Sequence, residues 1–159
     1  MHGDSATSRT VAIRGLAWYR SRPPNERATV EERLLAVWLL ELTGAYADAE
    51  RSARALRAED STNVDYWGML GSVAAEQGET ALADSVDRWL AHQSGDAVSW
   101  AASYYRARTA ALLGRRGDAI ARLREAADHG IWMTYLHIDP AFITIRATPE
   151  YTALTALKD

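Results

Sequence analysis

Apolar residues recur every three or four positions along almost the whole chain, which is the spacing that lines one face of an α-helix. No stretch shows the clear alternation of apolar and polar residues that is typical of a strand. Glycines, prolines and polar capping residues interrupt the pattern at short intervals, so tight turns should connect the helices. The pattern predicts no sheet and helices near 8–21, 30–43, 46–58, 64–77, 80–93, 97–113, 117–129 and 149–157.

Residues of known capping preference mark several of these helix ends. Pro23 and Pro24 cannot continue the first helix, because proline lacks the amide hydrogen and clashes with the preceding turn. Thr29 and Glu32 have the spacing of a capping box at the start of the second helix. Thr80 is expected to cap the fifth helix in the same way, as a residue with a side-chain acceptor.

Three turns share one pattern, in which a glycine is followed five residues later by an alanine. The three pairs are Gly44 with Ala49, Gly78 with Ala83, and Gly114 with Ala119. From this matched offset we expect Ala83 and Ala119 to be buried at close contacts between helices. The glycines are 34 and 36 residues apart. A helix pair that repeats about every 34 residues has the period of the tetratricopeptide repeat.

The third turn, Gly114-Arg115-Arg116-Gly117, also has the composition of an anion site at a helix start. Glycine occupies the same slot in the two turns without arginines, so Gly114 is expected to end a helix and turn the chain. Arg115 and Arg116 are then interpreted as solvated loop residues, and an anion site is the less favoured alternative.

The middle repeat carries the most specific motif, Trp67-x-x-Leu70-Gly71-x-x-Ala74, followed by Gly78 and Ala83. With this motif the chain resembles the tetratricopeptide repeat (TPR) family. The resemblance implies an all-α fold, a right-handed TPR-like α-solenoid of about three helix pairs with an N-terminal helix and a C-terminal helical cap. A single domain over 1–159 would consist of an N-terminal helix or half repeat (8–28), three repeats (29–62, 63–96, 97–130) and the cap (131–159).

The tail of the chain is similar to the segment that follows TPR arrays in large bacterial signalling and regulatory proteins. The shared elements are Asp139-Pro140, Phe142, Ile145-Arg146, Pro149, Tyr151 and Leu154. Asp139 and Thr148 should each cap a short helix that has proline in its first turn. The residues expected to cover the apolar face of the last repeat are Trp132, Leu136, Phe142, Ile145, Tyr151 and Leu154.

Composition narrows the classes of partner. The net charge of −3 argues against nucleic acid as the default partner, and no apolar run approaches the roughly 20 residues of a membrane span. The chain has no cysteine, which excludes disulfides and thiolate chemistry but does not fix the compartment. A cytoplasmic location is the default expectation, and a periplasmic one applies if the chain belongs to a longer exported protein.

Candidate catalytic and metal-binding chemistry is sparse. The chain has four histidines but no metalloprotease pair, phosphate-binding loop or nucleophile elbow. His92 and His129 fall near helix ends, where a cation suits the dipole. His137 and Asp139 are the basis of the weakest alternatives, a metal site or a hydrolase. We therefore expect no enzyme, no cofactor and no metal.

The TPR resemblance implies a concave groove lined by the first helix of each repeat. The candidate groove residues are Glu31, Leu34, Trp38, Glu41, Asp65, Ser72, Tyr104 and Arg108. Trp38, Tyr104 and Arg108 are expected to be partly exposed there, because these residue types dominate interface energetics. The alternative is that Trp38 and Tyr104 contact a missing repeat or the C-terminal cap.

The function that the resemblance implies is a protein–protein interaction module. It would bind a peptide segment or partner helix in the groove, and the identity of the partner is unknown. The alternative is a regulatory or dimerising C-terminal module of a larger bacterial signalling enzyme, and a homodimer is possible in that case.

Overall fold

The structure is a computed structural model that describes residues 5–93, 96–131 and 133–156, with side chains at 8–93, 100–131 and 136–156. The chain is 78% helix, and no strand occurs within those ranges. The all-α prediction is therefore confirmed. Trp132, which was expected in the cap, lies outside the described residues.

The helices follow one another with short connections. In chain order they are α1 (Ser5–Ser21), η1 (Glu26–Ala28), α2 (Val30–Thr43), α3 (Tyr46–Glu59), α4 (Val64–Glu76), α5 (Thr80–Ala91), α6 (Asp96–Leu112), α7 (Arg116–Asp128), α8 (Met133–Ile138), η2 (Pro140–Phe142) and α9 (Pro149–Thr155), where η marks a 3₁₀ turn. All the helices predicted from the sequence are present, and α8 is an addition to them.

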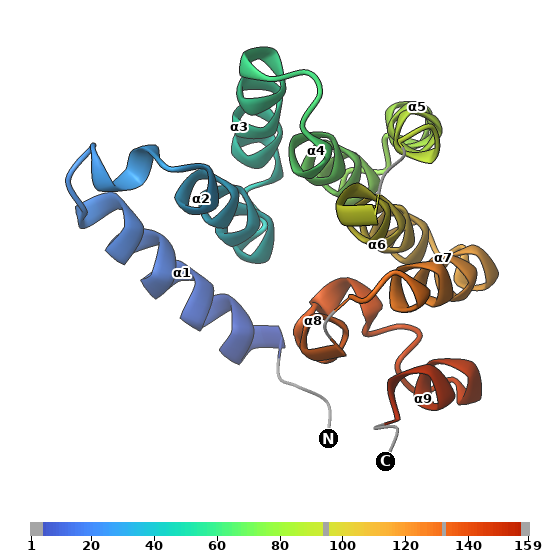
Figure 1. Cartoon of the computed structure of the whole chain (residues 1–159). Coiled ribbons are helices and arrows are strands. Elements are labelled where there is room, and N and C mark those ends of the chain that lie inside the picture. The colour runs from blue at the N-terminus through green and yellow to red at the C-terminus, as the bar shows by residue number, and fades with distance from the viewer. Residues whose placement is uncertain (1–4, 94–95, 132, 157–159) are drawn as a thin grey trace.

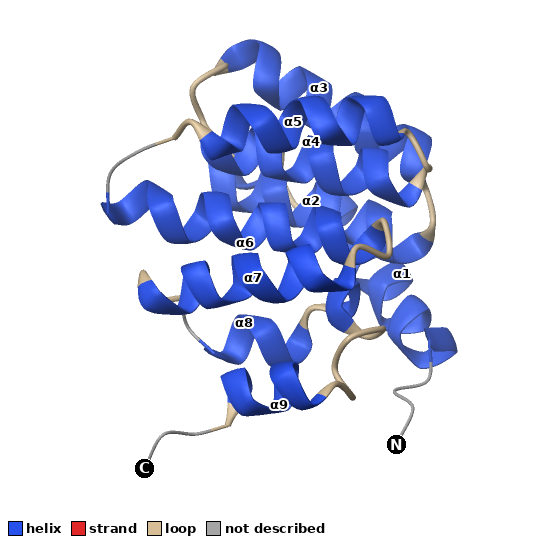
Figure 2. Cartoon of the chain, turned by 90° about the vertical axis from the view of Figure 1, so that its right-hand side faces the viewer, coloured by secondary structure: helices blue, strands red, loops and turns tan. Residues whose placement is uncertain are grey.

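From α1 to α7 each helix packs against the next, α9 packs against α7 and α8, and α4 also contacts α2 and α6. Figure 1 shows them along a curved row from α1 to α9, with α2, α4 and α6 on its inner side and α3 and α5 on its outer side. In the view of Figure 2, α5, α6 and α7 lie side by side, followed by α8 and α9. The inner helices are thus placed to share one surface.

Glycine turns connect the paired helices, as the repeat pattern predicts. Gly44, Gly78 and Gly114 have φ angles of 78°, 74° and 73°, in the left-handed region that favours glycine. After each glycine, the next amide donates to a carbonyl five residues back, from Ala45 to Leu40, Glu79 to Ala74 and Arg115 to Ala110. This is the Schellman geometry, which pairs the last carbonyls of a helix.

The small residues that follow these turns are buried between helices. Ala83 and Ala119 are fully buried, as predicted, and so is Ala49. A Cβ on Gly71 would lie 2.7 Å from Val86 Cγ1, so α4 and α5 can pack at this distance only with glycine there. Gly71 therefore allows the close packing of α4 against α5.

The predicted capping chemistry is right at one helix start and wrong at another. The Thr29 side chain accepts from the amide of Glu32, but the Glu32 carboxylate pairs with Arg22 instead of returning to the cap. At α5 the N-cap is Glu79, and the Thr80 hydroxyl points to the Gly78 carbonyl instead. Only the threonine half of the predicted capping box forms, because Arg22 pairs with the Glu32 carboxylate.

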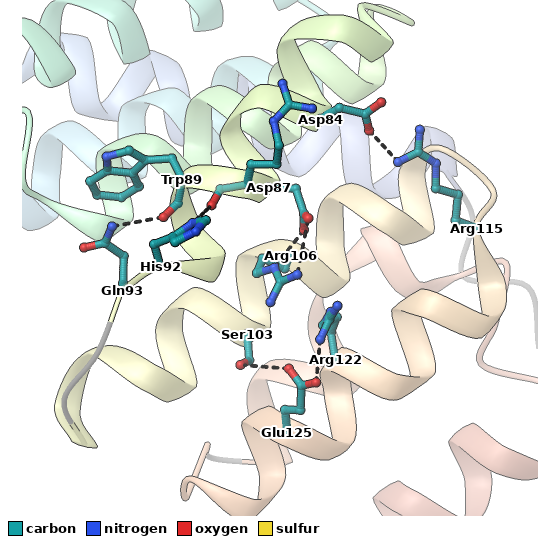
Figure 3. A network of polar contacts seen from close by, with 11 residues as sticks. Asp84, Asp87, Trp89, His92, Gln93, Ser103, Arg106, Arg115, Arg122 and Glu125 are labelled. Carbon is teal, nitrogen blue, oxygen red and sulfur yellow. Dashed lines mark hydrogen bonds and ion pairs between the residues drawn. The ribbon is translucent and has the colours of Figure 1, made fainter.

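Ion pairs join α5, α6 and α7 along their exposed edges (Figure 3). Arg106 Nε lies 2.8 Å from Asp87 Oδ1, and Arg115 Nη1 lies 2.5 Å from Asp84 Oδ1. Arg115 and Arg116 are exposed, as expected, and Arg115 in addition pairs with a carboxylate of the adjacent helix. The pair of Arg115 with Asp84 is half-exposed, and a pair of this kind contributes little stability, about 0–1 kcal/mol.

The C-terminal segment covers α6 and α7, as expected of a cap. Leu136, Phe142, Ile145 and Tyr151 are buried in one cluster with residues of α6 and α7, and Leu154 packs against it partly buried. The predicted caps are also present: the Asp139 side chain accepts from the amide of Ala141, and the Thr148 side chain accepts from the amide of Tyr151. Buried apolar residues therefore hold the end of the chain against the last helix pair.

Candidate binding pocket

A pocket of about 480 Å³ lies where the inner helices α2, α4 and α6 face the segment that follows α8. It is lined by Glu31, Leu34, Leu35, Trp38, Asp65, Met69, Trp100, Tyr104, Tyr105, Arg108, Ile138 and Asp139. Its volume is within the range of about 300–1,000 Å³ that is usual for ligand pockets. Apolar and aromatic side chains form most of the wall, and a few charged groups are placed among them.

Six of the eight groove residues singled out from the sequence line this pocket. They are Glu31, Leu34, Trp38, Asp65, Tyr104 and Arg108. The other two, Glu41 and Ser72, are buried and contact Arg108. The structure thus brings all eight together in one region but divides them between the pocket wall and the buried layer that supports it.

Arg108 is buried, so the expectation that it is partly exposed is wrong. Its side chain is 4% exposed, and its Nε lies 2.7 Å from Asp139 Oδ2. Its Nη1 donates to Ser72 Oγ at 3.1 Å, and its Nη2 lies 3.5 Å from Glu41 Oε2. Burial lowers the pKa of Arg108, but Asp139 and Glu41 raise it by more, so the guanidinium stays charged. Its hydrogen-bonding groups face partners within the protein.

Tyr104 contacts the C-terminal cap, which is one of the two contacts that the alternative to an exposed groove residue predicts. Its hydroxyl donates to Asp139 Oδ2 at 2.6 Å, and its ring meets the edge of Phe142 with centroids 6.1 Å apart. Burial raises the pKa of Tyr104, and the neighbouring carboxylate of Asp139 adds to the shift. Tyr104 therefore stays protonated as a hydrogen-bond donor and also forms part of the pocket wall.

Glu41 is a buried carboxyl group at the α2 side of Arg108. Burial raises the pKa of Glu41 to about 7, although the nearby Arg108 opposes the shift. Neither carboxylate oxygen accepts a hydrogen bond from the described part of the chain, and the 3.5 Å separation from Arg108 is too long for a well-formed one. Glu41 thus supports Arg108 weakly in comparison with Asp139.

Asp65 lies in the first turn of α4, where Asn63 caps the helix. Burial raises the pKa of Asp65, and a hydrogen bond from the Tyr105 hydroxyl lowers it in part. No ion pair reaches Asp65 from the residues that the structure describes. Asp65 is therefore a partly buried carboxylate on the pocket wall without a cationic partner of its own.

Tyr105 is a pocket residue that the sequence analysis did not single out. Its ring covers Gly68, where an added Cβ would lie 2.0 Å from Tyr105 Cγ. A glycine inside an amphipathic helix is a signal for such close packing, but the facing residue could not be deduced from spacing. The sequence also did not predict that Leu35, Met69, Trp100 and Ile138 line the pocket. Asp139 was predicted to cap a helix but not to line the pocket.

The three histidines in the described ranges do not line the pocket. His92 and His129 are the C-cap residues of α5 and α7, and His92 Nδ1 lies 2.6 Å from the Arg88 carbonyl oxygen. His137 is exposed, whereas Asp139 is buried against Arg108. Among the described residues, no three side chains of the kind that ligate metals gather at one point.

A scan against family models matches none, and searches of curated proteins and of solved structures find no match. No helix in the described ranges is both long enough and apolar enough to cross a membrane. The function must therefore be argued from the pocket itself.

Proposed function

We propose that the chain is a TPR-like solenoid that binds a peptide segment or partner helix, without catalysis, in the pocket on the inner side of its helix row. The observation that carries the proposal is the pocket of about 480 Å³ built from α2, α4 and α6. Its wall combines apolar surface with a few charged groups, a composition typical of ligand and peptide sites. The three matched glycine turns support the solenoid.

Four aromatic side chains support binding in particular, namely those of Trp38, Trp100, Tyr104 and Tyr105. Aromatic residues bury much area on binding and lose few rotamers, so they often provide the anchors of an interface. The buried ion pair of Arg108 with Asp139 holds α6 against the cap, so this part of the pocket wall is fixed before a partner arrives. A preformed wall reduces the entropy lost on association.

Panning a displayed library of random dodecapeptides on the purified chain tests the proposal. The wild-type chain should enrich a family of related peptides, and the pocket variant Trp38→Ala should fail to retain them. Trp18→Ala is the matched control, because Trp18 is 53% exposed on α1 and does not line the pocket. If the wild type enriches nothing beyond Trp38→Ala while both remain folded, the pocket does not bind peptides.

The alternative, a regulatory or self-associating module, is favoured by a different surface. Val11, Ile13 and Trp18 on α1 are 56%, 53% and 53% exposed, so this helix presents several large apolar side chains to solvent. A second copy or an adjoining domain could cover them. Sedimentation of the wild type and of an Ile13→Glu variant would show a concentration-dependent dimer that only the wild type forms.

A further inference from the structure

We propose that the pocket selects a basic side chain, a lysine or arginine of the bound segment, whose charge faces Asp65 and Glu31 and whose alkyl portion lies against the aromatic wall. This inference rests on the proposed peptide-binding function and adds the chemistry of the residue that is recognised. Three observations support it. The wall has more carboxylates than basic groups, it contains aromatic side chains, and its basic residue Arg108 is already paired within the protein.

The charge balance of the pocket is negative. Its described wall contains three carboxylates, Glu31, Asp65 and Asp139, and a single basic residue, Arg108. Arg108 is already engaged, because Asp139 lies 2.7 Å from its Nε and the nearby Glu41 lies 3.5 Å from its Nη2. A ligand carboxylate would therefore meet unpaired negative charge, and the only guanidinium of the wall is not available to it.

Two carboxylates remain for a ligand cation. Neither Glu31 nor Asp65 forms an ion pair within the described ranges. Glu31 is exposed in the first turn of α2, whereas Asp65 is partly buried in the first turn of α4. The pocket wall thus offers a cation one exposed carboxylate and one partly desolvated carboxylate, and the attraction is stronger at the desolvated one.

Burial without a cation has a cost that a ligand can remove. Desolvation raises the pKa of Asp65, which shows that its charged form is disfavoured in the free protein. The Tyr105 hydroxyl compensates only in part. An ammonium or guanidinium group at Asp65 would favour the ionised carboxylate again. A neutral or acidic ligand would not have this effect and so gains no comparable advantage.

The aromatic residues of the wall suit the rest of a basic side chain. Trp38 and Trp100 line the pocket on the α2 and α6 sides, and Tyr104 and Tyr105 follow on α6. Indole and phenol faces attract cations, and they also pack against the methylene groups of lysine and arginine. The same protein already makes such contacts on its surface, where Arg57 lies 4.8 Å from the ring centroid of Trp67.

The test uses the random dodecapeptide library on the wild-type chain, on Asp65→Asn, and on Asp128→Asn as a control with the same change in net charge. Asp128 is exposed at the end of α7, away from the pocket residues. We expect peptides selected by the wild type and by Asp128→Asn to be enriched in lysine or arginine at one position, beside an apolar residue. Asp65→Asn should lose this enrichment while its melting profile shows that it is folded.

A selected peptide then provides a quantitative check. Replacing its basic residue by norleucine, which keeps the alkyl chain and removes the charge, should weaken binding to the wild type at least tenfold and binding to Asp65→Asn much less. Enrichment without a preference for basic residues, or a norleucine peptide that binds as well as its parent, overturns the inference but leaves the peptide-binding function. If no peptide is enriched on the wild type, the proposed function itself fails, and the inference with it.

Discussion

The guanidinium of Arg108 and the carboxylate of Asp139 form an ion pair with both side chains almost completely buried, at 4% and 3% exposure. The pair joins α6 to the turn between α8 and η2. Asp139 also accepts from the Tyr104 hydroxyl and from the amide of Ala141, so its oxygens have several donors. One side chain thus fixes the position of the cap relative to the helices that form the pocket.

Replacing this carboxylate by its neutral amide should destabilise the fold strongly. Asp139→Asn keeps an acceptor for the amide of Ala141 but leaves the guanidinium of Arg108 buried with Glu41 alone. Breaking one side of a buried pair typically costs about 3–5 kcal/mol. Urea unfolding should show this loss, whereas Asp84→Asn, which breaks the half-exposed pair with Arg115, should cost at most about 1 kcal/mol. Equal losses in the two variants would contradict a special role for the buried pair.

The stability of the wild type should fall as the pH rises from about 4.5 to 7. Glu41 has a folded pKa of about 7 against an ordinary value of 4.5, so the folded state binds its proton more tightly than the unfolded state does. The stabilisation is complete below about pH 4.5 and is lost as the pH rises through about 7, and it amounts to about 2–4 kcal/mol at 1.36 kcal/mol per pKa unit.

Glu41→Gln isolates this contribution. The charged groups that face Glu41 are Arg108, Asp139 and Glu76, and all remain in the variant. Urea unfolding of both proteins at pH 5 and pH 8 should show a smaller difference between the two pH values in Glu41→Gln than in the wild type. Parallel pH profiles would mean that Glu41 titrates alike in the folded and unfolded states.

Enlarging the alanines that follow the glycine turns should destabilise the fold. Ala83 and Ala119 are fully buried, so leucine at either position would overpack the contact between helices, at a cost of about 1–3 kcal/mol. Ala81→Leu and Ala121→Leu are matched controls on the same two helices, at exposed positions. Melting midpoints that fall only in Ala83→Leu and Ala119→Leu would support the repeat register. Similar midpoints in all four variants would contradict it.

The glycine turns make a separate prediction. Gly78→Ala should cost about 1–2 kcal/mol, because alanine is strained at a φ of 74° even though no atom lies within 4 Å of the added Cβ. Gly117→Ala is the control, since Gly117 lies in α7 without a positive φ and has equally open space. It should be neutral or stabilise by up to about 1 kcal/mol. Chemical unfolding of the two variants distinguishes backbone strain from steric contact.

Local features were predictable because the residues that cause them are neighbours in the chain. The apolar period predicted the helices, and Gly44, Gly78 and Gly114 predicted the turns, since a left-handed backbone favours glycine wherever it occurs. The burial of Ala83 and Ala119 followed from their fixed distance to those turns. The cap was also predictable in outline, because Asp139-Pro140 and Thr148-Pro149 are local starts of helical turns.

The chemistry of the pocket was decided only by the tertiary structure. The sequence placed Arg108 on the inner face of α6, but it could not show that Ser72, Glu41 and Asp139 would surround it, because these residues come from α4, α2 and the cap. Whether a guanidinium faces solvent or a carboxylate depends on which distant segments pack beside it. The sequence by itself determined the helices, their turns and the inner face, and the packing of α2, α4, α6 and the cap decided that Arg108 is buried while Asp65 lines the pocket.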